Sequence, residues 1–321
     1  MAEGEFEFIA RRLRPLAAGT PGALRLLDDA ALLDPPEGAQ LVLTKDAMVA
    51  GVHFLADDPA AQIGQKLLRV NLSDLAAMGA EPIGYLLSIA RQRETSEAWL
   101  EGFCRGLAED QAEFGIGLLG GDTVSTPGPV TLSLTAIGQV PRGQALLRST
   151  AEEGDDLYVS GTLGDGALGL RVLLGELSLN AAATVFLADR YRRPQPRLAL
   201  GRALRGLAHA AIDISDGLLA DLGHVLEASD LGAEVWADRL PLSLAAREAA
   251  DAALEAALAG GDDYELLFTV PADRRAKVVR LASALELPLT RIGRLDVMPG
   301  LRVLDADGQP IHLDRTGWTH F

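Results

Sequence analysis

The stretch Asn71-Leu72-Ser73-Asp74-Leu75-Ala76-Ala77-Met78-Gly79-Ala80 closes a run of apolar residues at helical spacing. This spacing predicts a helix from Gln62 to Met78, and the glycine that follows it is a typical helix stop. Short apolar runs on either side, Leu41–Thr44 and Ile83–Ala90, predict strands, and Ser96–Phe114 predicts a second helix. Alternating strands and helices indicate an α/β (α+β) fold.

The stretch Val130-Thr131-Leu132-Ser133-Leu134-Thr135-Ala136 has a period of two. It predicts a strand with one apolar face and one face of hydroxyl groups. The hydroxyl face can meet solvent, as in an ordinary antiparallel strand, or it can meet the sheet of a partner subunit. We therefore expect a homodimer to form through this strand.

Residues 141–156 are rich in Pro, Gly and charge and predict a boundary between an N-terminal domain, 1–145, and a C-terminal domain, 146–321. The second half again mixes strands and helices. Its predicted strands are Asp156–Ser160, Ala211–Ile214 and Glu265–Val270, and its predicted helices are Arg197–Ala208, Leu218–Ala228 and Arg274–Leu285.

The charge balance is acidic, with 29 basic and 45 acidic residues and a net charge of −16. A nucleic-acid-binding protein normally carries a basic stripe, and the sequence has none, so we expect no nucleic-acid partner. The one dense basic run, Arg190–Arg197, is interpreted as a solvated helix end.

The single cysteine, Cys104, excludes disulfides within the chain and Cys-rich metal sites, and we expect it on a helix as a small buried or half-buried residue. No apolar run reaches the ~18 residues of a membrane span. The start of the chain does not resemble a signal peptide, so a cytoplasmic enzyme without a membrane partner is expected.

Six aspartate clusters lie in or beside apolar or small-residue stretches. They are Leu26–Asp29, Val42–Asp46, Asn71–Asp74, Leu118–Asp122, Ile212–Asp216 and Gly260–Asp263. Any one cluster can be structural, since Asp74 could cap a helix and Asp216-Gly217 could form a turn. Carboxylates gathered together repel one another unless a cation lies between them, and Mg²⁺ couples carboxylates to substrate phosphates. Together the clusters predict a site where several Mg²⁺ ions hold a polyphosphate.

The run Gly164-Asp165-Gly166-Ala167-Leu168-Gly169 matches the dinucleotide pattern G-x-G-x-x-G and follows a predicted strand. A dinucleotide site also needs a return strand and an acidic residue about 20 positions further on, whereas Ser178–Arg193 has the pattern of a helix and a basic loop. We therefore expect the glycines to allow close packing at a helix start, with Asp165 as N-cap, and keep the dinucleotide site as the alternative. The sequence has no P-loop and no protein-kinase signature.

Several segments resemble the thiamine-monophosphate kinase family in their order and spacing. They are Gly4-Glu5-Phe6, Asp28–Ala31, Val49–Phe54, Asn71–Ala80, Gly120–Thr123, Ile212–Gly217 and Gly260–Glu265. Asn71–Ala80 also marks the wider superfamily of aminoimidazole ribonucleotide synthetase, selenophosphate synthetase and the hydrogenase maturation factor. Val49–Phe54 and the closing Gly317–Phe321 resemble the thiamine enzyme more specifically.

The resemblance implies a two-domain aminoimidazole ribonucleotide synthetase-like fold, with an ATP- and Mg²⁺-binding N-terminal domain that dimerises and a C-terminal domain that covers the active site. It implies ATP-dependent phosphorylation of thiamine phosphate to thiamine diphosphate. Implied metal ligands are Asp29, Thr44, Asp46, Asp74, Asp122, Asp213 and Asp216. Implied nucleotide contacts are Gly121, Asp122, Arg148 and Ser215, and implied substrate contacts are His53, Asp262 and Trp318. Catalysis is expected to depend on Asp46, Asp74, Asp122 and Arg148.

Three residues depart from the family pattern. Lys45 stands among the metal positions where a small hydroxyl residue is usual, Leu27 replaces a Gly, and Asp262 replaces a Glu. The Lys45 ammonium can replace one cation, or it can point to solvent and leave only its carbonyl near the metals. Trp318 can stack on the substrate or pack on the domain surface. The alternative functions are another ATP-using synthetase of the superfamily and a dinucleotide-dependent dehydrogenase.

Overall fold

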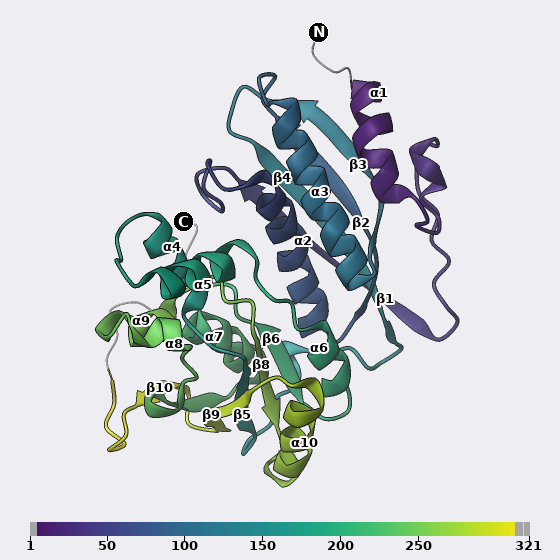
Figure 1. Cartoon of the computed structure of the whole chain (residues 1–321). Coiled ribbons are helices and arrows are strands. Elements are labelled where there is room, and N and C mark those ends of the chain that lie inside the picture. The colour runs from purple at the N-terminus through teal and green to yellow at the C-terminus, as the bar shows by residue number, and fades with distance from the viewer. Residues whose placement is uncertain (1–4, 312–316, 318–321) are drawn as a thin grey trace. The chain divides into compact units, whose positions relative to one another are not determined.

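The computed structural model describes residues 5–311 and Gly317, which form two compact units (Figure 1). The first unit comprises the residues up to Leu75 together with Ala80–Gly143, and the second comprises Ala76–Gly79 and the chain from Gln144 onward. Within the described residues, no helix is both long enough and apolar enough to cross a membrane.

The first unit is a four-stranded sheet with helices against one face. The chain begins with α1 (Glu5–Phe8), a π-helical turn (Ile9–Leu13) and 3-10 turns (Arg14–Ala17 and Leu24–Leu26). The remaining elements are β1 (Ala39–Val49), α2 (Ala60–Ala77), β2 (Glu81–Arg91), α3 (Glu97–Phe114), β3 (Gly117–Ser125) and β4 (Thr131–Pro141). The strand order is β1-β4-β2-β3, in which only the β2–β3 pair is parallel.

Helices α2 and α3 lie side by side (Figure 1) and are joined by a buried ion pair. Arg69 of α2 donates from Nε and Nη2 to the two carboxylate oxygens of Asp110 on α3, at 2.7 and 2.8 Å. The two helices also approach closely at Gly106, where an added Cβ would lie 1.9 Å from the carbonyl oxygen of Ala61. This approach therefore requires a residue without a side chain.

The second unit contains a six-stranded sheet of order β10-β7-β9-β5-β8-β6. Its strands are β5 (Asp156–Ser160), β6 (Ala210–Asp213), β7 (Gly232–Trp236), β8 (Leu266–Val270), β9 (Leu289–Asp296) and β10 (Gly300–Leu304). Its helices are α4 (Asp165–Leu173), α5 (Ala181–Arg192), α6 (Leu198–Leu204), α7 (Leu218–Ser229), α8 (Leu244–Arg247), α9 (Asp251–Ala259) and α10 (Arg275–Leu285).

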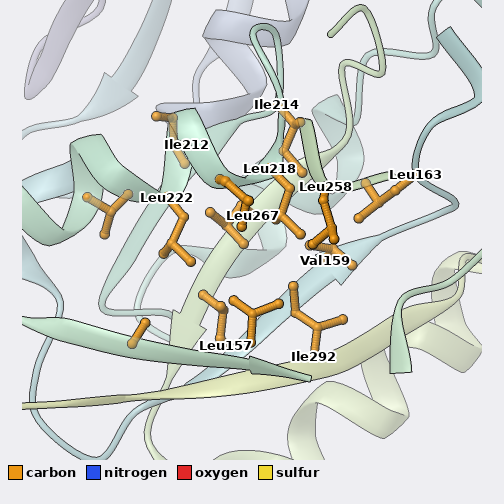
Figure 2. Close-up of a cluster of buried hydrophobic side chains, with 14 of the residues drawn as sticks. Leu157, Val159, Leu163, Ile212, Ile214, Leu218, Leu222, Leu258, Leu267 and Ile292 are labelled. Carbon is orange, nitrogen blue, oxygen red and sulfur yellow. The ribbon is translucent and has the colours of Figure 1, made fainter. Parts of the chain in front are cut away.

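The core of the second unit is a cluster of buried aliphatic side chains between this sheet and its helices. Figure 2 shows Leu157 and Ile292 from the strands facing Leu218 and Leu222 of α7. All four side chains are fully buried. Burying each side chain of this size contributes about 1.5–3 kcal/mol, so the cluster fixes the ends of the strands and the polar residues that follow them.

The dinucleotide interpretation of Gly164–Gly169 is wrong. Strand β5, which precedes this run, pairs antiparallel with both β8 and β9, so no parallel β-α-β unit forms there. The glycines instead allow close packing, because a Cβ on Gly166 or Gly169 would lie 2.3 or 2.1 Å from a backbone carbonyl oxygen. The predicted N-cap is also wrong: Gly164 occupies that position and Asp165 is the first residue of α4.

Most of the other predicted elements are present, with shifted ends. The strand predicted at Leu41–Thr44 runs the full length of β1, and Gly120-Gly121-Asp122 lies inside β3 rather than after it. The helix predicted at Arg197–Ala208 ends at Leu204, because the chain turns extended at Arg205. Cys104 is buried on α3, as expected.

The close approach of α2 and α3 predicts opposite effects for two glycine-to-alanine changes within helices. Gly106→Ala should lower the free energy of unfolding by roughly 1–3 kcal/mol, because the added methyl group forces the two backbones apart. Gly223→Ala on α7, where no atom lies within 4 Å of the added Cβ, should raise it by about 0.5–1 kcal/mol. Urea unfolding followed by circular dichroism measures both. A stabilised Gly106→Ala protein would contradict the close approach of the two helices.

Candidate active site

The residues implied as site residues divide between the two units. Those in the first unit are Asp29, Thr44, Lys45, Asp46, His53, Asp74, Gly121 and Asp122, and those in the second are Arg148, Asp213, Ser215, Asp216 and Asp262. Trp318 lies outside the described residues.

Strand β1 sends its polar side chains to opposite faces of the first sheet, because successive residues of a strand alternate. Thr44 and Asp46 face helix α2, where the Thr44 hydroxyl donates to Asp74 Oδ2 at 2.5 Å. Lys45 faces the other way and lines a cavity on the open side of the sheet. The structure therefore brings Thr44, Asp46 and Asp74 together and separates Lys45 from them.

Asp74 lies in the last turns of α2, so it does not cap the start of a helix. Burial, together with the smaller effect of the neighbouring Asp74 charge, raises the pKa of Asp46 from 3.8 to about 7. The Asp46 backbone N–H donates to Asn71 Oδ1 at 3.2 Å, and its carbonyl accepts from the Ser133 hydroxyl at 3.1 Å. This backbone is therefore fixed, and the ionised carboxylate pair needs positive charge beside it.

The cavity on the open face of the sheet has a volume of about 730 Å³, within the range of small-molecule sites of roughly 300–1,000 Å³. Its charged lining residues are Asp28, Asp29, Lys45 and Asp122, and its hydroxyl lining residues are Ser88, Thr123, Ser133 and Thr135. Ser133 and Thr135 belong to the hydroxyl face that the period-two pattern predicted on β4. That face therefore forms part of a polar cavity instead of an ordinary solvent surface.

A β-bulge places Asp122 on this cavity. The register of β2 and β3 shifts after Tyr85, and the extra residue, Leu119, precedes Gly120-Gly121-Asp122. Gly121 cannot carry a side chain, because its Cβ would lie 1.8 Å from the carbonyl oxygen of Leu87. Bulges re-aim side chains and are common beside active sites. Here the exposed Asp122 carboxylate accepts the Thr123 backbone N–H at 2.8 Å.

His53 is held as one tautomer. Its Nδ1 accepts the Val49 backbone N–H at 3.1 Å, which places the proton of the neutral ring on Nε2. The buried Lys66 ammonium donates to the His53 carbonyl at 3.1 Å. The backbone and Lys66 therefore fix the position and orientation of this residue.

The ligand set of the first unit fits a cation that a nucleotide helps to hold. In the described part of the chain, no three His, Cys, Asp or Glu side chains gather closely enough to hold a metal alone. Mg²⁺ is usually bound by one or two carboxylates together with substrate phosphates and water. The pair Asp46 and Asp74, with the Thr44 hydroxyl bound to Asp74, matches this pattern.

In the second unit, Ser215 and Asp216 lie on the loop between β6 and α7. Asp213, the last residue of β6, is almost fully buried, and Arg148 is exposed in a short 3-10 turn (Arg148–Thr150). The backbone N–H groups of Ser215, Asp216 and Gly217 all donate to the Asp221 side chain, at 3.0 to 3.1 Å. Asp221 was not expected as a site residue, although its place in the first turn of a helix after Asp-Gly is a recognisable pattern.

A second loop, Gly260–Glu265, pairs with the first through the backbone. The N–H groups of Asp262 and Tyr264 donate to the carbonyls of Ser215 and Ile214, at 2.9 and 2.8 Å. Both Asp262 and Tyr264 have positive φ, 68° and 51°, a conformation that L-residues rarely adopt. The loop that carries the implied substrate contact is thus strained and tied to the loop that carries the implied nucleotide contact.

The basic run Arg190–Arg197 is not a solvated helix end. Arg190 and Arg197 both donate to Glu265, which is fully buried and also accepts the Ser160 hydroxyl at 2.6 Å. This cluster could not be expected from the sequence, because its members lie up to 105 residues apart. Removing one partner of such a buried pair typically costs about 3–5 kcal/mol, since the other charge is left unpaired.

Two further carboxylates complete this cluster. Asp263 accepts the N–H groups of Gly164 and Gly166 at the start of α4, at 2.7 and 3.0 Å. Burial raises the pKa of Asp263 to about 8, despite these hydrogen bonds. Asp165 accepts the hydroxyls of Thr162 and Ser243, at 2.5 and 2.6 Å. The cluster therefore anchors the loop Gly260–Glu265 to β5 and α4.

Comparison with known families first defines the class of protein. The model of the AIR synthase related protein, N-terminal domain, matches residues 27–140. The model of the AIR synthase related protein, C-terminal domain, matches residues 152–305. The chain is therefore a two-domain protein of the AIR synthase-related class.

Full-length relatives narrow this class. The thiamine-monophosphate kinase of Caulobacter vibrioides is 46% identical over 98% of this chain and 90% of the relative. The crystal structure of the thiamine-monophosphate kinase from Stenotrophomonas maltophilia is 47% identical, with a TM-score of 0.87 over 97% of this chain and 99% of that chain. AaThiL complexed with AMPPCP and TMP is 31% identical, with a TM-score of 0.80 over 99% and 97% of the two chains. The chain belongs to the thiamine-monophosphate kinase family, which confirms the resemblance of the sequence segments.

The raised pKa of Asp46 predicts a pH-dependent stability in protein stripped of divalent cations. Its folded-state pKa of about 7 lies above the ordinary value of 3.8, so its contribution to stability is complete below the ordinary value and is lost as pH rises through about 7. In EDTA, Asp46→Asn should therefore be more stable than wild type at alkaline pH, with the advantage fading on acidification. Thermal unfolding against pH measures this difference.

The matched control is Asp57→Asn, which changes an exposed aspartate of the same unit and should leave the pH profile unaltered. Adding Mg²⁺ should remove the difference in thermal stability between wild type and Asp46→Asn at alkaline pH. Parallel profiles for Asp46→Asn and wild type in EDTA would show that Asp46 ionises normally in the folded protein.

Proposed function

We propose that this protein transfers the γ-phosphoryl group of ATP to thiamine monophosphate and forms thiamine diphosphate. The observation that carries the proposal is the full-length similarity to a ThiL structure complexed with AMPPCP, a methylene analogue of ATP, and TMP. The polar cavity of the first unit, with acidic and hydroxyl lining groups and one lysine, supports it. A dehydrogenase is not supported, because the glycine run of α4 lacks the parallel strand that a dinucleotide site requires.

The acceptor oxygen belongs to a phosphate that is ionised at neutral pH, so the chain does not need a strong general base. Its side chains are needed instead to align the two phosphates and to neutralise their charge. We assign this role to Asp46, Asp74, Asp122 and Arg148. The guanidinium of Arg148 is exposed and suits bidentate binding of a phosphate.

Asp29, Thr44, Asp46, Asp74 and Asp122 are our candidate Mg²⁺ ligands in the first unit, and Asp213 and Asp216 are those in the second. These residues would hold Mg²⁺ beside the phosphates, where it would supply positive charge against the negative charge that develops during transfer. Asp46 and Asp74 have the strongest support, because their repulsion favours a cation between them.

Lys45 is assigned to the phosphates in the cavity and not to the carboxylate pair. Its side chain lines the cavity together with Asp29 and Asp122, on the face of β1 opposite to Asp46. An ammonium there can neutralise a phosphate oxygen directly. We therefore propose that the Lys45 ammonium supplies part of the positive charge that a cation would supply in a relative whose residue at this position carries a hydroxyl group.

Gly121, Asp122, Arg148 and Ser215 are the proposed nucleotide contacts, and His53, Asp262 and Trp318 are the proposed contacts to thiamine monophosphate. The hydrogen bond that His53 Nδ1 accepts from the Val49 backbone N–H supports its role, because it fixes the orientation of the imidazole ring. Asp262 is one methylene shorter than the glutamate expected from the family pattern. The backbone of Asp262 has a φ of 68°. This conformation fixes the position of its Cβ, from which the shorter side chain extends.

We also propose a homodimer formed through the open face of the first sheet. Leu41 and Leu43 on this face, which do not line the cavity, are 37% and 63% exposed. Exposed apolar side chains gathered on one sheet face commonly mark an interface between proteins.

The acceptor is tested by incubating the protein with ATP, Mg²⁺ and either thiamine monophosphate or thiamine. We expect thiamine diphosphate and ADP in equal amounts from the first and no product from the second, because the site is built for two phosphates. The Asp122→Asn protein, prepared in parallel, should give no product and excludes a contaminating kinase. Equal turnover of thiamine and thiamine monophosphate would contradict the proposed phosphate acceptor.

The interface is tested by sedimentation of the wild type and of Leu43→Glu. The wild type should be a dimer at micromolar concentration, and the variant should dissociate at least roughly tenfold more readily, since an unpaired buried carboxylate costs more than about 1.4 kcal/mol. Leu244→Glu changes an 85% exposed leucine of the second unit and should remain dimeric. A monomeric wild type would contradict the dimer, and a fully dimeric Leu43→Glu would place the interface elsewhere.

A further inference from the structure

The loop Ile214–Gly217 has its backbone hydrogen bonds satisfied from two sides. On one side, the N–H groups of Ser215, Asp216 and Gly217 converge on a single oxygen, Oδ2 of Asp221, at 3.0, 3.1 and 3.1 Å. On the other side, the carbonyls of Ile214 and Ser215 accept the N–H groups of the loop Gly260–Glu265. The path of this backbone is therefore determined without any ligand.

The carboxylate that holds the loop is itself fixed in place. Asp221 is 3% exposed and belongs to the first turn of α7, where its own N–H donates to the Gly217 carbonyl at 3.0 Å. Leu218 and Leu222 on the same helix are buried in the core of the unit, which anchors α7 to the sheet. A rigid helix thus carries the acceptor, and a negative charge near its N-terminus is favourable.

Oδ2 of Asp221 already accepts three N–H groups, which leaves this oxygen no capacity to bind a cation or a substrate. The half-buried side chains of Ser215 and Asp216, in contrast, make no hydrogen bond among the described residues. Tying the backbone N–H groups to Asp221 leaves these two side chains to meet a ligand. Geometry of this kind is typical of groups that orient a binding site without touching the ligand.

We propose that Asp221 is a positioning residue that pre-organises the loop Ile214–Gly217 so that Ser215 and Asp216 can bind the metal-associated nucleotide. This proposal rests on the proposed function only because it takes the loop Ile214–Gly217 as a segment that binds the nucleotide. It does not depend on which acceptor the enzyme uses. Without Asp221, three adjacent N–H groups lose their common acceptor, and the loop must be ordered again each time a nucleotide binds.

The test compares Asp221→Asn with the wild type in binding of AMPPCP in the presence of Mg²⁺, followed by thermal shift. Asparagine keeps the shape of the side chain but removes its charge, which weakens all three hydrogen bonds. The AMPPCP concentration for half the maximal shift should rise by roughly 10–100-fold, the usual effect of losing an outer-shell partner. The KM for ATP should rise in parallel, whereas the KM for thiamine monophosphate should change by much less.

Glu227→Gln, an exposed acidic residue on the same helix, is the matched control and should bind AMPPCP like the wild type. If Asp221→Asn does not fold, Asp221→Glu, which keeps the charge but displaces it by one methylene, carries the same test with a smaller loss. A variant with a lowered melting temperature but unchanged AMPPCP affinity would show that Asp221 is merely structural and would overturn the proposal.

The two proposals can fail separately. Wild-type protein that does not phosphorylate thiamine monophosphate, together with weaker AMPPCP binding by Asp221→Asn, would refute the acceptor and support the role of Asp221. Wild-type protein that phosphorylates thiamine monophosphate, together with unchanged AMPPCP binding by Asp221→Asn, would support the acceptor and refute the role of Asp221.

Discussion

Neutralisation of buried negative charge is the constraint on which both units depend. In the second unit, Glu265 is fully buried, and Arg190 and Arg197 bind it, so the chain supplies its own counter-charge. In the first unit, Asp46 meets a second carboxylate, Asp74, and burial and this repulsion together raise its pKa to about 7. Ionisation of Asp46 beside Asp74 is therefore disfavoured unless positive charge lies near them, which favours binding of a cation in the first unit.

This difference explains how a chain of net charge −16 can handle two phosphorylated substrates. Phosphates approaching an acidic surface are repelled by several kcal/mol in total unless positive charge intervenes. A cation bound by Asp46 and Asp74 would lie on the face of β1 opposite to the ammonium of Lys45. The two would thus be separate sources of positive charge, and not alternatives for one position.

The alternating pattern of β4, the helical spacing of α2 and the short apolar runs around them were sufficient to predict the fold class and most elements of the first unit. The placement of Lys45 stayed open in the sequence, although the period of a strand already separates its side chain from that of Asp46. The cluster around Glu265 could not be predicted. A run of arginines at a helix end has the pattern of a solvated surface, and only tertiary structure brings Ser160 and Arg190 to a glutamate 105 and 75 residues further along the chain.

The loops Ile214–Gly217 and Gly260–Glu265 behave as one piece because their backbones share hydrogen bonds and because Asp221 and the Glu265 cluster hold them from opposite ends. Positive φ at Asp262 and Tyr264 costs of order 1–3 kcal/mol each, and such strain persists only where the surroundings fix the conformation. The stability that the buried cluster provides is thus used to hold a strained loop. The second unit therefore orders these two loops before any ligand binds, whereas in the first unit burial and repulsion disfavour ionisation of Asp46 beside Asp74. On the proposed function, little of the binding energy of the nucleotide would then be lost in ordering the loops Ile214–Gly217 and Gly260–Glu265.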